Sequence, residues 1–216
     1  MLLALLLQAS APSDSIAFRH PNGVGPPVAT AVRAGRAPVV DGRLDDAAWA
    51  LATPVTDLTQ SDPNEGQPAT ERTEVRFMYD GDALYVGARM FDREPRKIAH
   101  HLGRRDSFTQ SDDIRILLDS YHDHRTAFRF IVAPDGVRGD LQFGDDGNFA
   151  DPSWDPVWEA AARVDSLGWT AELRIPLSQL RFSRARAQVW GLRIVRNILR
   201  KNETDIFPFV HKTDAG

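Results

Sequence analysis

Hard oxygen donors gather in the stretch GDLQFGDDGNFADPSWD, residues 139–155. Carboxylate and amide oxygens are the ligands that Ca²⁺ prefers, although the spacing here does not follow the EF-hand loop. The same residue types are also typical of solvated turns. A weak calcium site and a set of acidic turns therefore both stay open. The donors of such a site would be Asp140, Asp145, Asp146, Asn148 and Asp151.

Other chemistry-bearing residues do not assemble into a recognisable active site. His122 and His124 lie two apart in a polar turn, without further ligands at zinc-binding spacing. A sandwich glycosidase needs two carboxylates across a cleft, but the comparable strand carries Arg115 where a second carboxylate would be required. Glu159 and Glu172 are interpreted as solvent-exposed surface residues. The chain contains no Gly-x-Ser-x-Gly, phosphate loop or His-Glu-x-x-His. We therefore expect no catalysis from this segment.

Three of the five tryptophans fall within residues 154–169 and raise the question of a sugar-stacking surface. Trp158 and Trp169 alternate with polar residues on the two arms of a predicted hairpin, so both are expected in the core. Trp154 lies in a Pro- and Asp-rich loop where nothing alternates. We therefore expect Trp154 to be exposed and available for binding.

Composition limits the partners. The chain is 42% hydrophobic and 26% charged, as expected of one soluble globular domain. A formal net charge of -4, with Arg and Asp interleaved, argues against nucleic acid as a partner. The absence of cysteine excludes disulfides and thiolate chemistry. No apolar run is long enough to span a bilayer as a helix.

The beginning of the chain resembles the second half of a secretory signal. An apolar run, residues 2–7, is followed by the small residues Ala9-Ser10-Ala11. Residues 1–11 are thus predicted to be a signal-peptide remnant, and residues 12–37, rich in Pro, Gly and Ala, are predicted to be a linker. We expect the protein to be exported, to the periplasm, the outer membrane or the cell exterior.

From Val39 onward, period-2 alternation dominates the sequence. The clearest hairpin is predicted over residues 73–91, and further strands follow at regular spacing. A short strand or turn followed by a brief helix is expected over residues 39–52, and a short helical turn is expected over residues 176–182. Eight or nine strands with hardly any helix predict an all-β antiparallel sandwich of jelly-roll type over residues 38–212.

Several motifs in register resemble carbohydrate-binding module family 9. They are VVDGRLDDAAW, VRFMYDGDALYVGARMFD, SDDIRILLDS, AFRFIVAPDGVRGD, GWTAELRIPLSQL and WGLRIVRNI, in the family's order. The resemblance implies a non-catalytic β-sandwich that binds oligosaccharide or polysaccharide chain ends and supports carbohydrate catabolism. Similar domains also precede outer-membrane β-barrel regions. The alternative is therefore a structural or interaction domain that caps such a barrel in the same polypeptide, with the sugar site lost.

The resemblance also implies where a sugar would bind. The family's two stacking tryptophans fall on Phe108-Thr109 and on Phe207 to Phe209, and an acidic position falls on Arg115, a change of sign. Arg129 matches the family's arginine, and it alternates with Phe128 and Phe130, so it is expected on the face turned away from the core. Asp112 and Asp113 could complete a polar ring. The candidate sugar-binding residues are Phe108, Arg115, Arg129, Trp154, Phe207 and Phe209.

Overall fold

The computed structural model describes residues 16–19, 29–101, 103–106, 110–145, 148–185 and 187–214. These residues form thirteen strands and short 3₁₀ turns. The strands are β1 (Ile16–Arg19), β2 (Ala29–Arg33), β3 (Thr59–Asp62), β4 (Thr73–Tyr79), β5 (Ala83–Phe91), β6 (Asp113–Asp119), β7 (Ala127–Val132), β8 (Arg138–Gly144), β9 (Phe149–Asp151), β10 (Glu159–Asp165), β11 (Gly168–Pro176), β12 (Gln188–Ile198) and β13 (Glu203–Phe207). The 3₁₀ turns are η1 (Ala47–Leu51), η2 (Pro95–Lys97), η4 (Leu177–Gln179), η5 (Leu199–Lys201) and η6 (Lys212–Asp214). Within these described ranges, no helix is long and apolar enough to cross a membrane.

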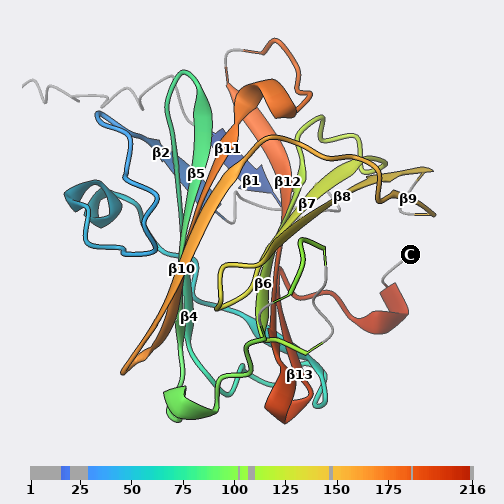
Figure 1. Cartoon of the computed structure of the whole chain (residues 1–216). Coiled ribbons are helices and arrows are strands. Elements are labelled where there is room, and N and C mark those ends of the chain that lie inside the picture. The colour runs from blue at the N-terminus through green and yellow to red at the C-terminus, as the bar shows by residue number, and fades with distance from the viewer. Residues whose placement is uncertain are drawn as a thin grey trace, which may run out of the picture.

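The strands form two facing sheets (Figure 1). Sheet B has the order β10-β11-β5-β4-β2, and sheet A has the order β12-β6-β7-β8-β9 with β13 and β3 beside β12. Strand β1 links the two sheets, because it runs parallel to β12 and antiparallel to β2. The all-β sandwich predicted from the sequence is confirmed, and the expected short helices are 3₁₀ turns.

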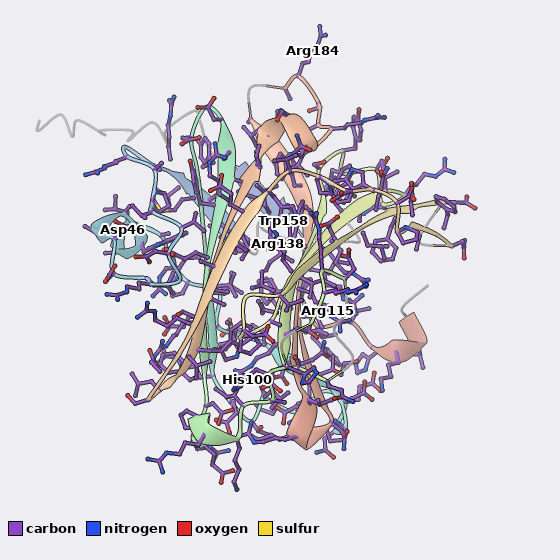
Figure 2. The ribbon with its side chains drawn as sticks, viewed as in Figure 1. Asp46, His100, Arg115, Arg138, Trp158 and Arg184 are labelled. Carbon is purple, nitrogen blue, oxygen red and sulfur yellow. The ribbon has the colours of Figure 1, made fainter. Side chains whose placement is uncertain are left out.

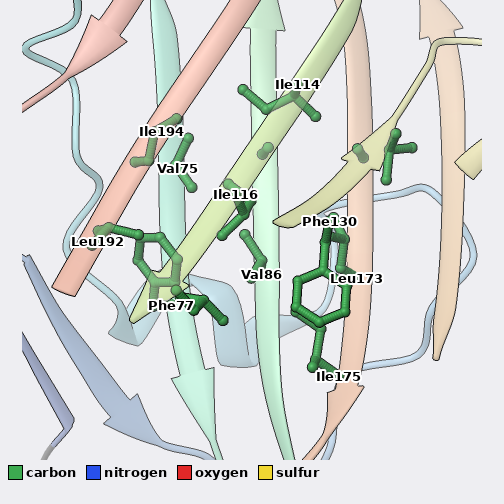
Figure 3. Packing of buried hydrophobic residues seen from close by; sticks show 14 of the residues in the cluster. Val75, Phe77, Val86, Ile114, Ile116, Phe130, Leu173, Ile175, Leu192 and Ile194 are labelled. Atoms are coloured by element: carbon green, nitrogen blue, oxygen red, sulfur yellow. The ribbon is translucent and has the colours of Figure 1, made fainter. Parts of the chain in front are cut away.

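Alternation builds the core between the sheets. Inward residues of β6, β7 and β12 pack against inward residues of β4, β5 and β11, as Figure 3 shows for Ile116 and Ile194 facing Val75 and Val86. Because successive side chains of a strand point to opposite faces, the residues between them form the outer face of each sheet. That alternation decides which polar side chains can meet a ligand.

The hairpin of β10 and β11 decides whether Trp158 and Trp169 could form a sugar-stacking surface. β10 and β11 pair from Glu159↔Arg174 to Asp165↔Gly168. Trp158 is 2% exposed and Trp169 is 0% exposed, so both lie in the core as predicted. These two rings stabilise the sandwich and offer no stacking surface.

Part of the stretch expected to be a linker belongs to the sheets. β1 and β2 lie within residues 12–37, and β2 pairs in parallel with β4 through Val32↔Met78. The predicted signal-peptide remnant, residues 1–11, lies outside the described residues.

A second, smaller apolar cluster covers part of the outer face of sheet B. Trp49 and Leu44, from the segment of residues 39–52, pack over Gly87 of β5, together with Met78 and Tyr85. This cluster gives the motif VVDGRLDDAAW a structural role, because its tryptophan closes the outer side of the sheet.

A buried carboxylate fixes that segment in place. Glu172 of β11 accepts hydrogen bonds from Trp49 Nε1 at 2.9 Å, from Asp41 N at 3.0 Å and from Gly42 N at 2.9 Å. Glu172 is 1% exposed, so the sequence interpretation of it as a solvent-exposed surface residue is wrong. Its burial outweighs the three donors and raises its pKa above the ordinary glutamate value.

Gly87→Ala tests how tightly this segment packs. A Cβ at Gly87 would lie 2.8 Å from Leu44 Cδ2 and 3.0 Å from the Trp49 ring. We expect a loss of about 1–3 kcal/mol in the free energy of unfolding, the usual effect of overpacking, measured by urea denaturation. Gly144→Ala is the matched control, since its Cβ would meet only Phe149 Cδ1 at 3.8 Å. An equal effect of the two substitutions would contradict the packing argument.

Two buried charged residues lie side by side on β12 and β13. Arg196 of β12 is 0% exposed and donates to the backbone oxygens of Glu71, Arg72 and Phe91. Asp205 of β13 pairs in register with Arg196 and is also 0% exposed. The two Asp205 carboxylate oxygens have no hydrogen-bond partner among the described residues. Burial, and next the Glu203 carboxylate, raise the pKa of Asp205 to about 7.

Candidate functional site

The outer face of sheet A carries polar side chains on three adjacent strands. On β6 the inward residues Ile114 and Ile116 leave Asp113, Arg115 and Leu117 on the outer face. By the same alternation, β7 places Arg129 outward and β12 places Arg193 outward. Figure 2 shows Arg115 beside β6. The prediction that Arg129 lies on the face turned away from the core is confirmed.

Strand register brings the three arginines together. Leu117 pairs with Arg193 on one side and with Arg129 on the other, so these residues form one row across β12, β6 and β7. Arg115 is two residues from Leu117 on β6, on the same face. Leu117 thus lies among three guanidinium-bearing residues.

Arg115 is neutralised and oriented by its neighbours. Its Nε and Nη2 donate to the two carboxylate oxygens of Asp113, at 2.7 and 3.0 Å. Asn197 Nδ2 donates to Asp113 Oδ1 at 2.8 Å, and Thr204 Oγ1 donates to Asn197 Oδ1 at 3.0 Å. This polar ladder crosses β13, β12 and β6, and it holds Arg115 in a fixed position.

Arg129 and Arg193 have no such partner. Both are half-buried, and within the described ranges neither guanidinium makes a hydrogen bond or an ion pair to another residue. The Arg129 Nε is buried without an acceptor, and its guanidinium lies over the Phe143 ring at 5.1 Å. Burial lowers the pKa of Arg193, and burial followed by the nearby Arg115 lowers the pKa of Arg129. Both remain charged near neutral pH, because an arginine does not lose its proton in proteins.

This surface can therefore donate hydrogen bonds to a ligand. Each guanidinium offers five N–H donors in a planar fork. Phe143 adds an aromatic side chain, half-buried on β8, where its pairing with Ala127 places it on the same outer face. Unsatisfied donors next to an aromatic ring are what a polar ring-shaped ligand requires.

The aromatic residues expected to form a sugar platform do not meet on one surface. Phe207 pairs in register with Ile194 and is buried in the core at 9% exposure, so it is not a platform residue. Phe209 lies beside Gly66 and edge-on to His211, with ring centroids 4.8 Å apart. Phe108 lies outside the described residues.

Trp154 also differs from its prediction. It packs against the core rings of Phe128 and Phe130, at centroid distances of 4.9 and 5.7 Å, and is half-buried. A loop without alternation can still fold back over the end of a sandwich, and here the apolar rings of β7 draw the indole inward. Trp154 is therefore a packing residue rather than an exposed plate.

Asp112 is likewise not part of the outer polar face. It is 1% exposed, and its Oδ1 accepts a hydrogen bond from Leu199 N at 2.9 Å. Burial raises its pKa to about 6. Asp113 alone of this pair joins the outer face.

The expected calcium donors do not form a cluster in the structure as described. Asp140 accepts hydrogen bonds from Trp158 Nε1 at 2.9 Å and Arg105 Nη2 at 2.6 Å, and Arg138 lies over the same indole (Figure 2). Asp151 accepts from the backbone and side chain of Ser153. Asp145 and Asn148 are exposed, and Asp146 lies outside the described residues. Among the residues described, no group of three or more histidines and carboxylates could hold a metal ion.

Sequence reasoning missed three members of the face, Arg193, Asn197 and Phe143. The signal for the first two is present in the sequence, because Trp190, Leu192 and Ile194 alternate as apolar residues and the residues between them must then face outward. Phe143 lies in a strand that the sequence does predict, over residues 137–143, but the face on which its side chain lies was not assigned.

The described residues thus form a two-sheet β-sandwich whose outer face carries polar side chains. A family model described as carbohydrate family 9 binding domain-like matches residues 40–207. The chain therefore belongs to the family 9 carbohydrate-binding domains. No curated protein matches it in sequence.

Solved structures share this fold. A carbohydrate-binding module of family 9 from Caldicellulosiruptor kristjanssonii, in complex with cellotriose, is 20% identical, with a TM-score of 0.56 over 81% of this chain and 80% of that one. The glucose complex from the same organism is 19% identical, with a TM-score of 0.56 over 81% and 83% of the chains. A Bacteroides uniformis protein that is proposed to bind carbohydrate gives 8% identity and a TM-score of 0.60 over 82% and 86%.

Proposed function

We propose that this chain binds carbohydrate on the outer face of sheet A, taking the ends of oligosaccharide or polysaccharide chains in support of carbohydrate catabolism. One observation carries the proposal. Arg129 and Arg193 are half-buried on an outer face without acceptors among the described residues, in a domain of a sugar-binding family. Sugar hydroxyls would supply the missing acceptors.

The residues around these arginines suit a sugar. Arg115 is held by Asp113, so its remaining N–H groups point from a fixed position, which lowers the entropic cost of binding. Phe143 offers an apolar ring beside Arg129. The Caldicellulosiruptor kristjanssonii module forms a complex with glucose, a single sugar unit, which supports recognition of a chain end here.

Calorimetric titration with glucose and cellotriose tests the proposal. We expect saturable binding with a Kd between micromolar and millimolar, about -8 to -4 kcal/mol. Arg129→Ala should weaken it by about tenfold or more, since removal of a charged hydrogen-bond donor costs about 1.5–3 kcal/mol. Arg184→Ala is the matched control, because Arg184 is exposed in the loop before β12, at the far end from β13 in Figure 2.

Two outcomes would contradict this assignment. Binding that Arg129→Ala leaves unchanged would place the sugar elsewhere on the molecule. If circular dichroism shows that the protein is folded and the titration still releases no heat of binding, the proposal of sugar binding is wrong. The function would then be that of an interaction domain with a protein partner.

A further inference from the structure

We infer that the ligand of this face is an acidic saccharide, one that carries a carboxylate or a sulfate group, such as a uronate-containing chain. This inference rests on the proposed function and names the chemical class of its ligand. It follows from the charge of the outer face of sheet A and from which of those charges already have partners.

The charges of the face do not balance. Three arginines lie on β6, β7 and β12, namely Arg115, Arg129 and Arg193. Asp113 forms a bidentate ion pair with Arg115 and so balances the charge of one of the three arginines. Asp119, at the far end of β6, uses its two oxygens for the backbone amides of Asp123 and His124. Among the described residues, Arg193 is left without a counter-charge, and Arg129 has only the nearby Asp113, whose two oxygens Arg115 already holds.

The two unpaired guanidinium groups are close enough to act on one ligand. Their strands flank β6, so the two backbones are about 10 Å apart, twice the spacing of neighbouring strands. Only Leu117 lies between them in the row. Arginine side chains are long enough to converge across that distance on a single acidic sugar unit.

An anion satisfies this arrangement better than a neutral hydroxyl does. A carboxylate accepts two parallel hydrogen bonds from one guanidinium and also cancels its charge. A hydroxyl would fill an acceptor position but leave two cations half-buried, which is unfavourable. Burial is the main cause that lowers the pKa of Arg129, and the nearby Arg115 lowers it further. A bound anion would relieve that repulsion between the two guanidinium groups.

The experiment compares one saccharide with and without its charge. Tri-galacturonate and its fully methyl-esterified form differ only in the carboxylates, and both are titrated into the full chain at low and high salt. We expect the acid to bind about tenfold or more tighter than the ester, because charge-assisted hydrogen bonds are about twice as strong as neutral ones. Added salt should weaken the binding of the acid and leave the binding of the ester unchanged.

Variants assign the effect to the unpaired arginines. Arg193→Ala should reduce the affinity for the acid to that for the ester, and Arg193→Lys should retain part of the preference, since lysine keeps the charge but loses the planar fork. Arg184→Ala should bind as the wild type does. Thermal unfolding of each variant confirms that it is folded.

The outcomes separate this inference from the proposed function. Equal affinities for acid and ester, both reduced by Arg129→Ala, would overturn the acidic ligand and leave sugar binding intact. Sodium sulfate or acetate that binds as tightly as tri-galacturonate would also overturn it, because the site would then recognise a free anion and not a saccharide. Absence of binding to every sugar would overturn both proposals.

Discussion

Glu172→Ala should lower the free energy of unfolding by about 3–5 kcal/mol, one of the two largest effects that we expect in this protein. The substitution leaves Trp49 Nε1 and the amides of Asp41 and Gly42 without the acceptor they now share. Each buried donor left unsatisfied costs about 1–3 kcal/mol. The segment of residues 39–52 would also lose its anchor to sheet B.

Urea denaturation followed by tryptophan fluorescence measures this effect. Glu159→Ala is the matched control on the same hairpin, since Glu159 is exposed and pairs with Arg174 at 3.1 Å. We expect the control to change stability by less than about 1 kcal/mol, as surface ion pairs do. A double-mutant cycle with Trp49→Phe should give a coupling energy of about 0.5–3 kcal/mol. Additive effects of the two substitutions would contradict the hydrogen bond between Trp49 and Glu172 as an anchor of this segment.

Asp205→Asn should increase stability at pH 8 by roughly 2–4 kcal/mol, because the wild-type carboxylate is buried and ionised there at a cost. The pKa of Asp205 is raised from 3.8 to about 7, and each tenfold difference in proton affinity between the folded and unfolded states corresponds to about 1.4 kcal/mol. The folded state holds this proton more tightly than the unfolded state. The stabilisation is thus fully present below about pH 4 and lost as the pH rises through about 7.

The difference between the two stability–pH profiles reports on Asp205 together with Glu203, whose carboxylate acts directly on it, because the other carboxylates are common to both proteins. The advantage of Asp205→Asn over the wild type should be largest at pH 8 and should shrink as the pH falls towards 4, so the two profiles converge or cross. Asp112, whose pKa is raised to about 6, contributes a smaller effect of the same sign in both proteins. Asp45→Asn, at an exposed carboxylate, is the control. Parallel profiles for the wild type and Asp205→Asn would contradict the prediction.

Local alternation predicted the parts of the fold that depend on one strand at a time. It placed Trp158 and Trp169 in the core and Arg129 on the outer face, and the structure confirms all three. The family motifs predicted the sandwich, because they mark strands in a fixed order. Both kinds of signal are contained in short stretches of sequence.

Long-range packing accounts for most of what the sequence did not reveal. Glu172 alternates as an outward residue, yet a segment about 130 positions earlier covers it. Trp154 belongs to a loop without periodicity, and its burial depends on the rings of β7. Phe207 was assigned from the family pattern, whereas its pairing opposite Ile194 turns it into the core.

The segment of residues 39–52 makes the two sides of the sandwich unequal, and this asymmetry has a practical consequence. Its side of the molecule carries Trp49 and Leu44 over sheet B, while the arginine row occupies the opposite side. Ala50 is exposed on that covered side. Because the chain has no native cysteine, Ala50→Cys would give a single thiol through which the domain could be immobilised or labelled with its arginines turned toward solution.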